Sequence, residues 1–300
     1  MGANVKYDIA IIGGDKRTAC MAPILAEKGY KIICYCTLEI PASVKYHCNN
    51  TYNNRIFYAS SLKEALDNTQ IIICGIPFLK DRNLYIDNCK ACPSQITLSE
   101  FQRCLHKKQK IFAGVIPADF SQICEERNIC CYDFMKDEPL TLFNAVATAE
   151  GAILEALMHR DSCLHRSNVL VMGYGRCGKT LADKLKGLSA CVTVCSNSDN
   201  ELALASSLGM STLPLSKLVN SIGNFEYIFN TIPACVITKQ CLAATRCGCI
   251  IIDIASNRIG IDYSVSDKYN CDCHYCPGLP GKYSCWSCAK ILSNFVIERI

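Results

Sequence analysis

Residues 168–182 read NVLVMGYGRCGKTLA, and this stretch decides the fold. A short, mainly apolar run at 168–172 has the composition of a buried strand, and the glycines that follow it match the pattern G-x-G-x-x-G. Leucines at 181, 185 and 188 then recur at helical spacing. A strand, a glycine-rich turn and a helix in this order are typical of the phosphate-binding element of a Rossmann fold.

The three glycines of this pattern have different physical roles. Gly173 permits the tight turn, Gly175 lets the backbone approach a pyrophosphate, and Gly178 lets the helix pack closely on the sheet. The helix N-terminus adds unpaired N–H groups and the positive end of its dipole. The alternative is a glycine turn that holds no ligand. The favoured interpretation is a nicotinamide dinucleotide bound by Gly173, Tyr174, Gly175, Arg176, Cys177 and Gly178.

The end of the next predicted strand bears on which dinucleotide binds. An Asp or Glu there would bind the ribose 2′-hydroxyl of NAD. This chain has instead three small polar residues, Ser196, Asn197 and Ser198, which favour NADP because no carboxylate repels a 2′-phosphate. The lack of an arginine keeps NAD open, with Asp199 as its partner.

Two later strands are predicted to end at the same edge of the sheet. Residues 230–233 read NTIP and residues 253–256 read DIAS. Ligands of open α/β sheets bind at the carboxyl ends of the strands. We therefore expect further cofactor contacts from Thr231, Ile232, Pro233 and Ala255, although both segments also fit ordinary strand ends.

The first half of the chain repeats the pattern of the second. Residues 7–15 combine a strand-like run with a Gly-Gly-Asp turn, residues 71–77 match 227–233, and residues 111–117 match 250–255. Continuous apolar runs that alternate with helices predict parallel strands covered on both faces. The fold class is therefore α/β, with two Rossmann-like, doubly wound parallel-sheet domains joined by a long helix.

The predicted domains follow from this repeat. Residues 1–143 form an N-terminal, Rossmann-like substrate or catalytic domain, and residues 144–165 form an interdomain helix and linker. Residues 166–284 form the NAD(P)-binding domain. Residues 285–300 form a C-terminal helix, which we expect to pack back on the N-terminal domain.

Composition and charge exclude several classes of function. Half of the 300 residues are hydrophobic and the net charge is only +4, so neither a disordered chain nor a nucleic-acid partner is expected. The longest apolar run, 71–79, is less than half of the roughly 20 residues that span a membrane. Residues 1–7 lead directly into a strand pattern and resemble no signal peptide. We therefore expect a cytoplasmic protein without a membrane segment.

The chain contains 24 cysteines, many of them at strand positions that need a small apolar residue. We interpret most as reduced, buried thiols. The C-x-x-C spacings at 89–92, 273–276 and 285–288, with His274, raise the question of a zinc site. Residues 271–276, however, are predicted to form a strand whose side chains point alternately to opposite faces. No metal site is predicted.

Segments spread over nearly the whole chain carry a resemblance to a known family: residues 11–15, Asn144 with 150–151, 173–182, 230–233, 253–256 and 277–282, the last reading PGLPGK. Together they resemble the A-subunit family of dipicolinate synthase. The PGLPGK segment is the most selective of them, since many dehydrogenases share the glycine pattern. Members of this family often carry Arg at the position of Asn197, and this departure weakens the NADP preference that the resemblance implies.

The resemblance implies oxidation of a dihydrodipicolinate-type precursor to pyridine-2,6-dicarboxylate, with hydride passed to NAD(P), for bacterial sporulation. It also implies a small dicarboxylate substrate, the flavoprotein-like B-subunit of dipicolinate synthase as partner, and the mother-cell cytoplasm as location. Self-association into a homo-oligomer stays open.

A dicarboxylate needs cations or N–H donors at both ends, and loss of a ring proton needs an acceptor. The cation candidates are Arg17, Arg82, Arg258 and Lys282, of which Lys282 follows a glycine-proline loop. Backbone N–H groups of the first glycine turn, at 13–14, are candidate donors for a carboxylate. The proton acceptor is Glu150 or Asp15, although Glu150 fits equally a helix carboxylate that orients the hinge. The predicted catalytic residues are Glu150, Lys282, Asp15 and Arg17.

Two alternatives stay open at this point. One is another two-domain dehydrogenase, acting on an amino or hydroxy acid. The other is a non-catalytic subunit that uses a bound dinucleotide to support a flavoprotein partner.

Overall fold

Parallel strands account for both large sheets, as the continuous apolar runs predicted. The computed structural model describes most of the chain: residues 7–48, 54–67, 69–87, 92, 95–269 and 271–300. The predicted absence of a signal peptide and the C-x-x-C residue Cys89 concern positions outside these residues. The chain forms two units, unit 1 with residues 1–141 and 284–300, and unit 2 with residues 142–283.

Unit 1 is built on a six-stranded sheet in the order β3-β2-β1-β4-β7-β8. Its strands are β1 (Ile9–Ile12), β2 (Ile32–Tyr35), β3 (Ile56–Tyr58), β4 (Ile71–Ile73), β7 (Lys110–Ala113) and β8 (Cys130–Asp133), with a small hairpin of β5 (Leu79–Lys80) and β6 (Asn83–Leu84). Its helices are α1 (Lys16–Glu27), α2 (Leu62–Asp67), α3 (Leu98–Arg103), α4 (Ala118–Glu126) and α11 (Cys285–Ile297).

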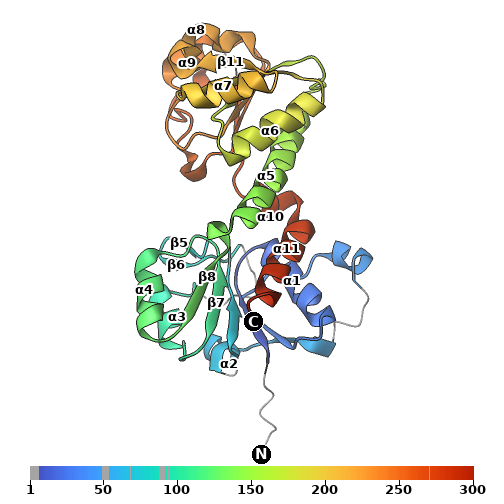
Figure 1. The fold of residues 1–300 in the computed structure, drawn as a ribbon, viewed down its shortest axis with the longest axis vertical. Coiled ribbons are helices and arrows are strands. Elements are labelled where there is room, and N and C mark those ends of the chain that lie inside the picture. Colours follow the sequence, from blue (N-terminus) through green and yellow to red (C-terminus); the bar gives the residue numbers. More distant parts are fainter. Residues whose placement is uncertain (1–6, 49–53, 68, 88–91, 93–94, 270) are drawn as a thin grey trace, which may run out of the picture. The chain divides into compact units, whose positions relative to one another are not determined.

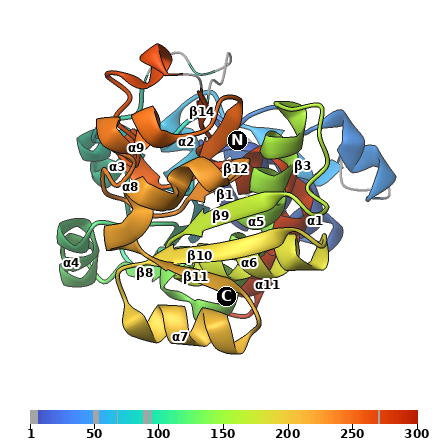
Figure 2. The same ribbon diagram turned by 90° about the horizontal axis from the view of Figure 1, so that it is seen from above.

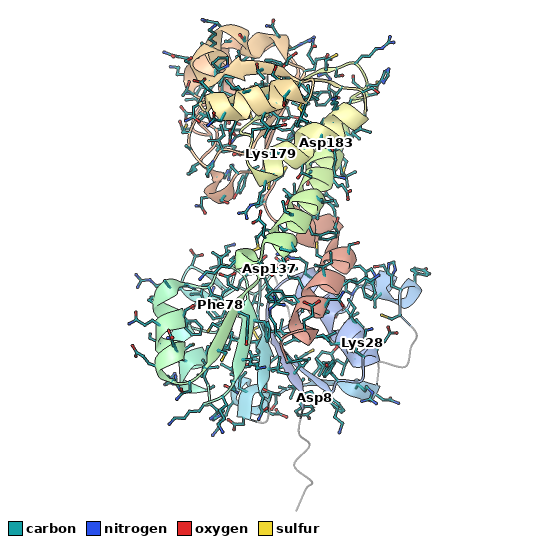
Figure 3. All side chains as sticks on the ribbon, viewed as in Figure 1. Asp8, Lys28, Phe78, Asp137, Lys179 and Asp183 are labelled. Carbon is teal, nitrogen blue, oxygen red and sulfur yellow. A yellow bond between two sulfur atoms is a disulfide. The ribbon has the colours of Figure 1, made fainter. Side chains whose placement is uncertain are left out.

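Both faces of the sheet are buried at its centre, which explains why β1 and β4 are apolar at every position. Ile9 and Ile11 pack into one core, and Ala10 and Ile12 pack into the core on the opposite face. Successive side chains of a strand point to opposite faces, so an uninterrupted apolar run needs cover on both sides. On the second face, Phe78 packs its ring against two other buried phenylalanines (Figure 3).

The C-terminal helix α11 is part of unit 1, where it lies beside α1 (Figure 1). Phe295 of this helix is 7% exposed. Its ring makes edge-on contacts with Phe112 and Phe134, with centroids 6.3 and 5.5 Å apart. Helix α11 therefore packs into the same core as β1 and α1 of unit 1.

Unit 2 has the same topology, with strand order β11-β10-β9-β12-β13-β14 (Figure 2). Its strands are β9 (Asn168–Met172), β10 (Cys191–Ser196), β11 (Ser211–Pro214), β12 (Tyr227–Asn230), β13 (Cys249–Asp253) and β14 (Cys271–Tyr275). Its helices are α6 (Arg176–Gly187), α7 (Asp199–Ser207), α8 (Leu218–Ser221), α9 (Lys239–Ala244) and α10 (Leu279–Tyr283). The strand order reverses between β9 and β10 on one side and β12 on the other, which is where ligands of this fold bind.

Helix α5 (Glu138–Met158) begins six residues before the predicted start at 144. Pro139 falls in its first turn, where a missing N–H costs nothing, and the backbone N–H of Leu140 donates to Asp137 Oδ1 at 3.1 Å. Residues 138–143 do not show the apolar spacing that identifies a helix in a sequence, so the helix was predicted to begin only at 144.

By length and composition, α5 is also the one helix among the described residues that is apolar enough to cross a membrane. The expectation that no segment meets this criterion is therefore wrong, because it considered only uninterrupted apolar runs. Ala149, Ala152 and Ala156 of α5 are fully buried in the core of unit 2. This packing accounts for the hydropathy of the helix without a membrane.

One pair of cysteines is an exception to the interpretation of most cysteines as reduced, buried thiols. Cys36, at the end of β2, forms a disulfide with Cys92, 56 residues later. The other cysteines that the structure describes are free. Spacing along the chain does not reveal which loops of unit 1 meet, so the sequence had no signal for this bridge.

Truncating Phe295 tests the return of the C-terminal helix to unit 1. We expect Phe295→Ala to lower the free energy of unfolding by about 3 kcal/mol, because it leaves a cavity between two rings. Chemical denaturation measures this loss. Lys290→Ala on the exposed side of α11 is the control and should change stability by less than about 0.5 kcal/mol. Equal effects of the two substitutions would contradict this packing.

Candidate dinucleotide site

The glycine turn between β9 and α6 has the geometry that a bound pyrophosphate requires. Gly173 has a φ of +86°, in the left-handed region that favours glycine. A Cβ at Gly178 would overlap the carbonyl oxygen of Gly173, so only glycine lets α6 start this close to the strand. A Cβ at Gly175 would meet no protein atom within 4 Å and would stand in open space at the helix N-terminus. A ligand can therefore approach the backbone at Gly175.

The side chains of this turn contribute unequally. Tyr174 is 1% exposed, and its hydroxyl lies 3.9 Å from Met210 Sδ in the core of unit 2. The Tyr174 side chain therefore packs in the core, so a cofactor contact of Tyr174 would have to come from its backbone. Arg176 is exposed in the first turn of α6, and Cys177 is half-buried. Burial raises the pKa of the Cys177 thiol, which keeps it neutral near pH 7.

Neighbouring strands hold the glycine turn from both sides. The N–H of Gly173 donates to the carbonyl of Cys195 in β10 at 2.8 Å. On the other side, Thr231 donates from both its backbone N–H and its hydroxyl to the carbonyl of Met172, at 3.0 and 2.8 Å. The turn is thus positioned by the ends of β10 and β12, the two strands that flank β9.

The structure brings the NTIP and DIAS segments together through a buried polar pair. Asn230 and Asp253 are both 0% exposed, and Asn230 Nδ2 donates to Asp253 Oδ1 at 2.9 Å. The hydroxyl of Tyr263 donates to Asp253 Oδ2 at 2.8 Å, and the N–H of Ala255 donates to Oδ1 at 3.2 Å. Burial and this hydrogen bond raise the pKa of Tyr263, so it remains a donor. A Cβ at Gly260 would overlap the pair.

This network fixes the loops that follow β12 and β13. Asn230 Oδ1 accepts the N–H of Ile232 at 3.1 Å, and Asn230 Nδ2 donates to the carbonyl of the same residue at 3.1 Å. Thr231 and Ile232 are half-buried, Pro233 is exposed, and Ala255 is 4% exposed. Sequence reasoning missed Tyr263 and Gly260. Both lie in the loop after β13, and only the fold brings them next to Asp253 at the end of that strand.

A carboxylate lies at the end of β10, contrary to the sequence interpretation. Glu201, in the first turn of α7, accepts a hydrogen bond from Ser196 Oγ at 2.6 Å. Ser196 is 2% exposed, Asn197 is exposed and Ser198 is half-buried. The sequence interpretation considered only the strand end, whereas the first turn of the next helix folds back over it.

The predicted catalytic pair of unit 1 is engaged within the protein. Arg17 and Asp15 are 5% and 6% exposed, and Arg17 Nη2 lies 2.7 Å from Asp15 Oδ2. Burial acts to lower the pKa of Arg17, but the charge and hydrogen bonds of Asp15 outweigh it and raise that pKa. The N–H of Gly14 donates to the carbonyl of Tyr85 at 2.7 Å. The chain itself thus occupies this N–H and pairs Arg17 with Asp15, so the structure gives no support to the expectation that they bind a carboxylate ligand.

The predicted proton acceptor of unit 2 is also paired. Glu150 Oε1 lies 2.8 Å from Lys184 Nζ of α6, and the Glu150 side chain is 56% exposed. The neighbouring Gly151 packs against Leu279 and Tyr283 of α10. This pairing favours the alternative in which Glu150 is a helix carboxylate that orients its neighbours.

Lys282 and Arg258 line one hollow of about 360 Å³ along β14, together with Glu155, His159 and His274. Lys282 Nζ lies 2.5 Å from Glu155 Oε1, which also accepts the hydroxyl of Tyr283 at 2.8 Å. Burial acts to raise the pKa of Glu155, but these hydrogen bonds lower it overall, and they raise the pKa of Lys282. Arg258 also stacks on Tyr263, 4.7 Å from the ring centroid. Arg82, a further cation candidate, is exposed between β5 and β6 in unit 1.

Three possible metal ligands meet beside this hollow: His159, Asp272 and His274 have ligand atoms within 4.8 Å of one another. The two imidazoles are stacked, with centroids 3.5 Å apart and 14° between the planes. Ring nitrogens offer their lone pairs within the ring plane, so stacked rings do not converge on one ion. The C-terminal cysteines divide between the units, with Cys271 and Cys273 in unit 2 and Cys285 in unit 1.

Two glycine substitutions separate folding from cofactor binding. Gly175→Ala should leave the unfolding free energy nearly unchanged and weaken dinucleotide binding at least about tenfold, because its methyl group fills only the ligand's space. Gly178→Ala should destabilise the protein by about 2 kcal/mol or more, because its methyl group overlaps backbone. Thermal unfolding and nucleotide titration of both variants measure this. A Gly175 variant that binds normally would argue against a ligand here.

The Glu155–Lys282 pair predicts a pH-dependent contribution to stability. Because the pKa of Glu155 is lowered in the fold, this residue contributes stability above its unfolded pKa of about 4.3. That contribution is lost as the pH falls. Because the pKa of Lys282 is raised in the fold, this residue contributes stability below its unfolded pKa of about 10.4, and that contribution is lost as the pH rises. Glu155→Gln should therefore cost about 1 kcal/mol between about pH 5 and 10, and less outside that window, with the half-exposed amine partly screened by water.

Denaturation of this variant across the pH range gives the measurement. Glu150→Gln is the matched control, because it breaks a more exposed carboxylate–lysine pair and should cost less than about 0.5 kcal/mol. A cost for Glu155→Gln that does not vary with pH would contradict the assignment.

Known proteins resemble this chain in sequence and in fold. Residues 8–135 match the family model for the N-terminal domain of the dipicolinate synthase A-subunit. The A-subunit of dipicolinate synthase from Bacillus subtilis (strain 168) is 28% identical over 190 residues, which span 63% of this chain and 64% of that protein. The alignment thus covers less than two thirds of the relative's length.

Solved structures show the same fold over a longer range. The crystal structure of the dipicolinate synthase A-subunit from Bacillus halodurans has a TM-score of 0.79, with 24% identity and 97% of each chain covered. An L-alanine dehydrogenase has a TM-score of 0.57, with 13% identity, 96% of this chain and 88% of that chain covered. The chain is therefore similar to the dipicolinate synthase A-subunit in sequence and fold, and its residues 8–135 match the model of the N-terminal domain of that protein.

Proposed function

We propose that this chain is the oxidoreductase subunit of a dipicolinate synthase. Its reaction would convert a dihydrodipicolinate-type precursor to pyridine-2,6-dicarboxylate during sporulation, in the mother-cell cytoplasm. The observation that carries the proposal is the glycine turn of unit 2, where Gly175 leaves open backbone at a helix N-terminus. In the same chain, residues 8–135 match the model of the N-terminal domain of the dipicolinate synthase A-subunit.

The residues fit a nicotinamide dinucleotide, which supplies the hydride acceptor when bound. Gly173, Gly175 and Gly178 would receive the pyrophosphate at the start of α6. The buried Asn230–Asp253 pair would hold the loops after β12 and β13 at the nicotinamide side of the switch point. Oxidation of the dihydropyridine removes one hydride and one proton, so a base must accept the proton as the ring becomes aromatic.

Carboxylate recognition in unit 2 would come from the hollow along β14. Arg258 carries a guanidinium there, which matches the requirement of a small dicarboxylate for a cationic partner. Lys282 is paired with Glu155 but is 54% exposed, so a carboxylate would have to share its amine with that residue. The flavoprotein-like B-subunit is part of the proposal, because likeness to an A-subunit implies that a second polypeptide completes the enzyme.

One observation favours the second candidate, a non-catalytic subunit that binds a dinucleotide to support its partner. Each predicted proton acceptor already has a cationic neighbour: Asp15 contacts Arg17, and Glu150 contacts Lys184. Under this alternative, the base that completes the reaction belongs to the partner.

The test uses the full chain with NAD⁺ or NADP⁺ and freshly formed product of dihydrodipicolinate synthase, with and without the flavoprotein-like partner. Reduced nicotinamide is followed optically and dipicolinate by chromatography. Formation of both by the chain alone supports the oxidoreductase, and Gly175→Ala should raise the dinucleotide concentration needed for turnover at least about tenfold without unfolding the protein. Tight binding with turnover only after addition of the partner supports the second candidate. Turnover of L-alanine or a hydroxy acid instead would overturn the proposed substrate.

A further inference from the structure

The end of β10 is where a Rossmann fold meets the adenosine ribose of its dinucleotide. In this chain the strand end adjoins the glycine turn directly, since the N–H of Gly173 donates to the carbonyl of Cys195 at 2.8 Å. Ser196, the next residue, ends the strand and is 2% exposed. A side chain that hydrogen-bonds to Ser196 is therefore held one residue away from Cys195, whose carbonyl contacts the glycine turn. This inference rests on the proposed dinucleotide site.

Glu201 is held at this strand end by a short chain of hydrogen bonds. Ser196 Oγ donates to Glu201 Oε2 at 2.6 Å, and the same Oγ accepts the N–H of Ser198 at 3.1 Å. Ser198 Oγ in turn caps the helix by accepting the N–H of Glu201 at 3.4 Å. Among the described residues no donor contacts Glu201 Oε1. One carboxylate oxygen is thus anchored and the other is available to a ligand.

A purely structural role would place this side chain differently. Ser198-Asp199-Asn200-Glu201 matches the capping box S-x-x-E, in which the glutamate returns to the N–H of the capping residue. Here the N–H of Ser198 is taken by Ser196 Oγ, and Glu201 reaches past the cap to the strand end. The cap by Ser198 therefore explains where the helix begins. The direction of the Glu201 carboxylate is set instead by its hydrogen bond with Ser196.

The charge of the segment around β10 and α7 opposes a 2′-phosphate, although Arg176 is exposed at the glycine turn. Asp199 and Glu201 both lie in the first turn of α7, where they already complement its positive dipole end. Residues 187–216 contain no Lys or Arg, and Lys186 is engaged with the carbonyl of Leu208 at 2.5 Å, at the other end of α7. A phosphomonoester with about two negative charges would meet two carboxylates and no cation from this segment.

We propose that Glu201, oriented by Ser196, accepts a hydrogen bond from the 2′-hydroxyl of the adenosine ribose and makes the site selective for NAD over NADP. This reverses the preference for NADP, which rested on the absence of a carboxylate at the strand end. A 2′-hydroxyl donates to Glu201 Oε1, whereas a 2′-phosphate offers only acceptors and like charge at the same place.

Equilibrium titration of the full-length wild-type chain with NAD⁺ and with NADP⁺ tests the proposal without requiring turnover. We expect NAD⁺ to bind about 100-fold more tightly than NADP⁺. Glu201→Gln should weaken NAD⁺ binding about tenfold and bring the ratio of the two affinities close to one. Ser196→Ala should lower the ratio less, because it releases the carboxylate without removing it.

Asp183→Asn is the matched control, because it removes one negative charge from the exposed face of α6 (Figure 3) and should change neither affinity. Thermal unfolding of each variant shows that the fold is retained. Tighter binding of NADP⁺ by the wild type, or an unchanged ratio in folded Glu201→Gln, overturns the role of Glu201 and leaves the dinucleotide site intact. If the wild type binds neither nucleotide, the proposed function fails as well.

Discussion

The contact between Gly178 and the carbonyl oxygen of Gly173 is the constraint on which the site of unit 2 depends. No side chain fits between them, so α6 begins directly against the end of β9. That approach leaves the N-terminus of α6 open at Gly175, and Thr231 of β12 closes the turn from the side. Backbone geometry therefore builds the cofactor turn, and the buried Tyr174 contributes only packing.

The buried carboxyl group of Asp253, which has no ion pair among the described residues, organises the other strand ends. Asp253 is fully buried and is stabilised by donors from Asn230, Ala255 and Tyr263. Each of these donors offsets part of the cost of removing a charge from water, and a lost donor would leave that cost uncompensated. The loops after β12 and β13 are consequently held in one arrangement, which suits a ligand at the switch point of the sheet.

The two units share a topology and differ in what fills the glycine turn. In unit 1, Gly14 donates its N–H to the carbonyl of Tyr85, and Asp15 holds Arg17 in a buried pair. The protein chain itself satisfies the donors that a phosphate would otherwise meet. In unit 2 the matching turn stays open at Gly175. The repeat therefore preserves a scaffold, and only the second copy retains the features of a dinucleotide site.

The sequence by itself determined the class of fold, the parallel sheets and the glycine turn, because strand and helix periodicity and the glycine pattern act over short stretches of chain. Only the tertiary structure decided which charged groups are available. It paired Arg17 with Asp15, Glu150 with Lys184 and Lys282 with Glu155, and it brought Glu201 to the end of β10. Burial and hydrogen-bond partners depend on contacts between distant residues, which a linear pattern does not contain. The Cys36–Cys92 disulfide escaped prediction for the same reason.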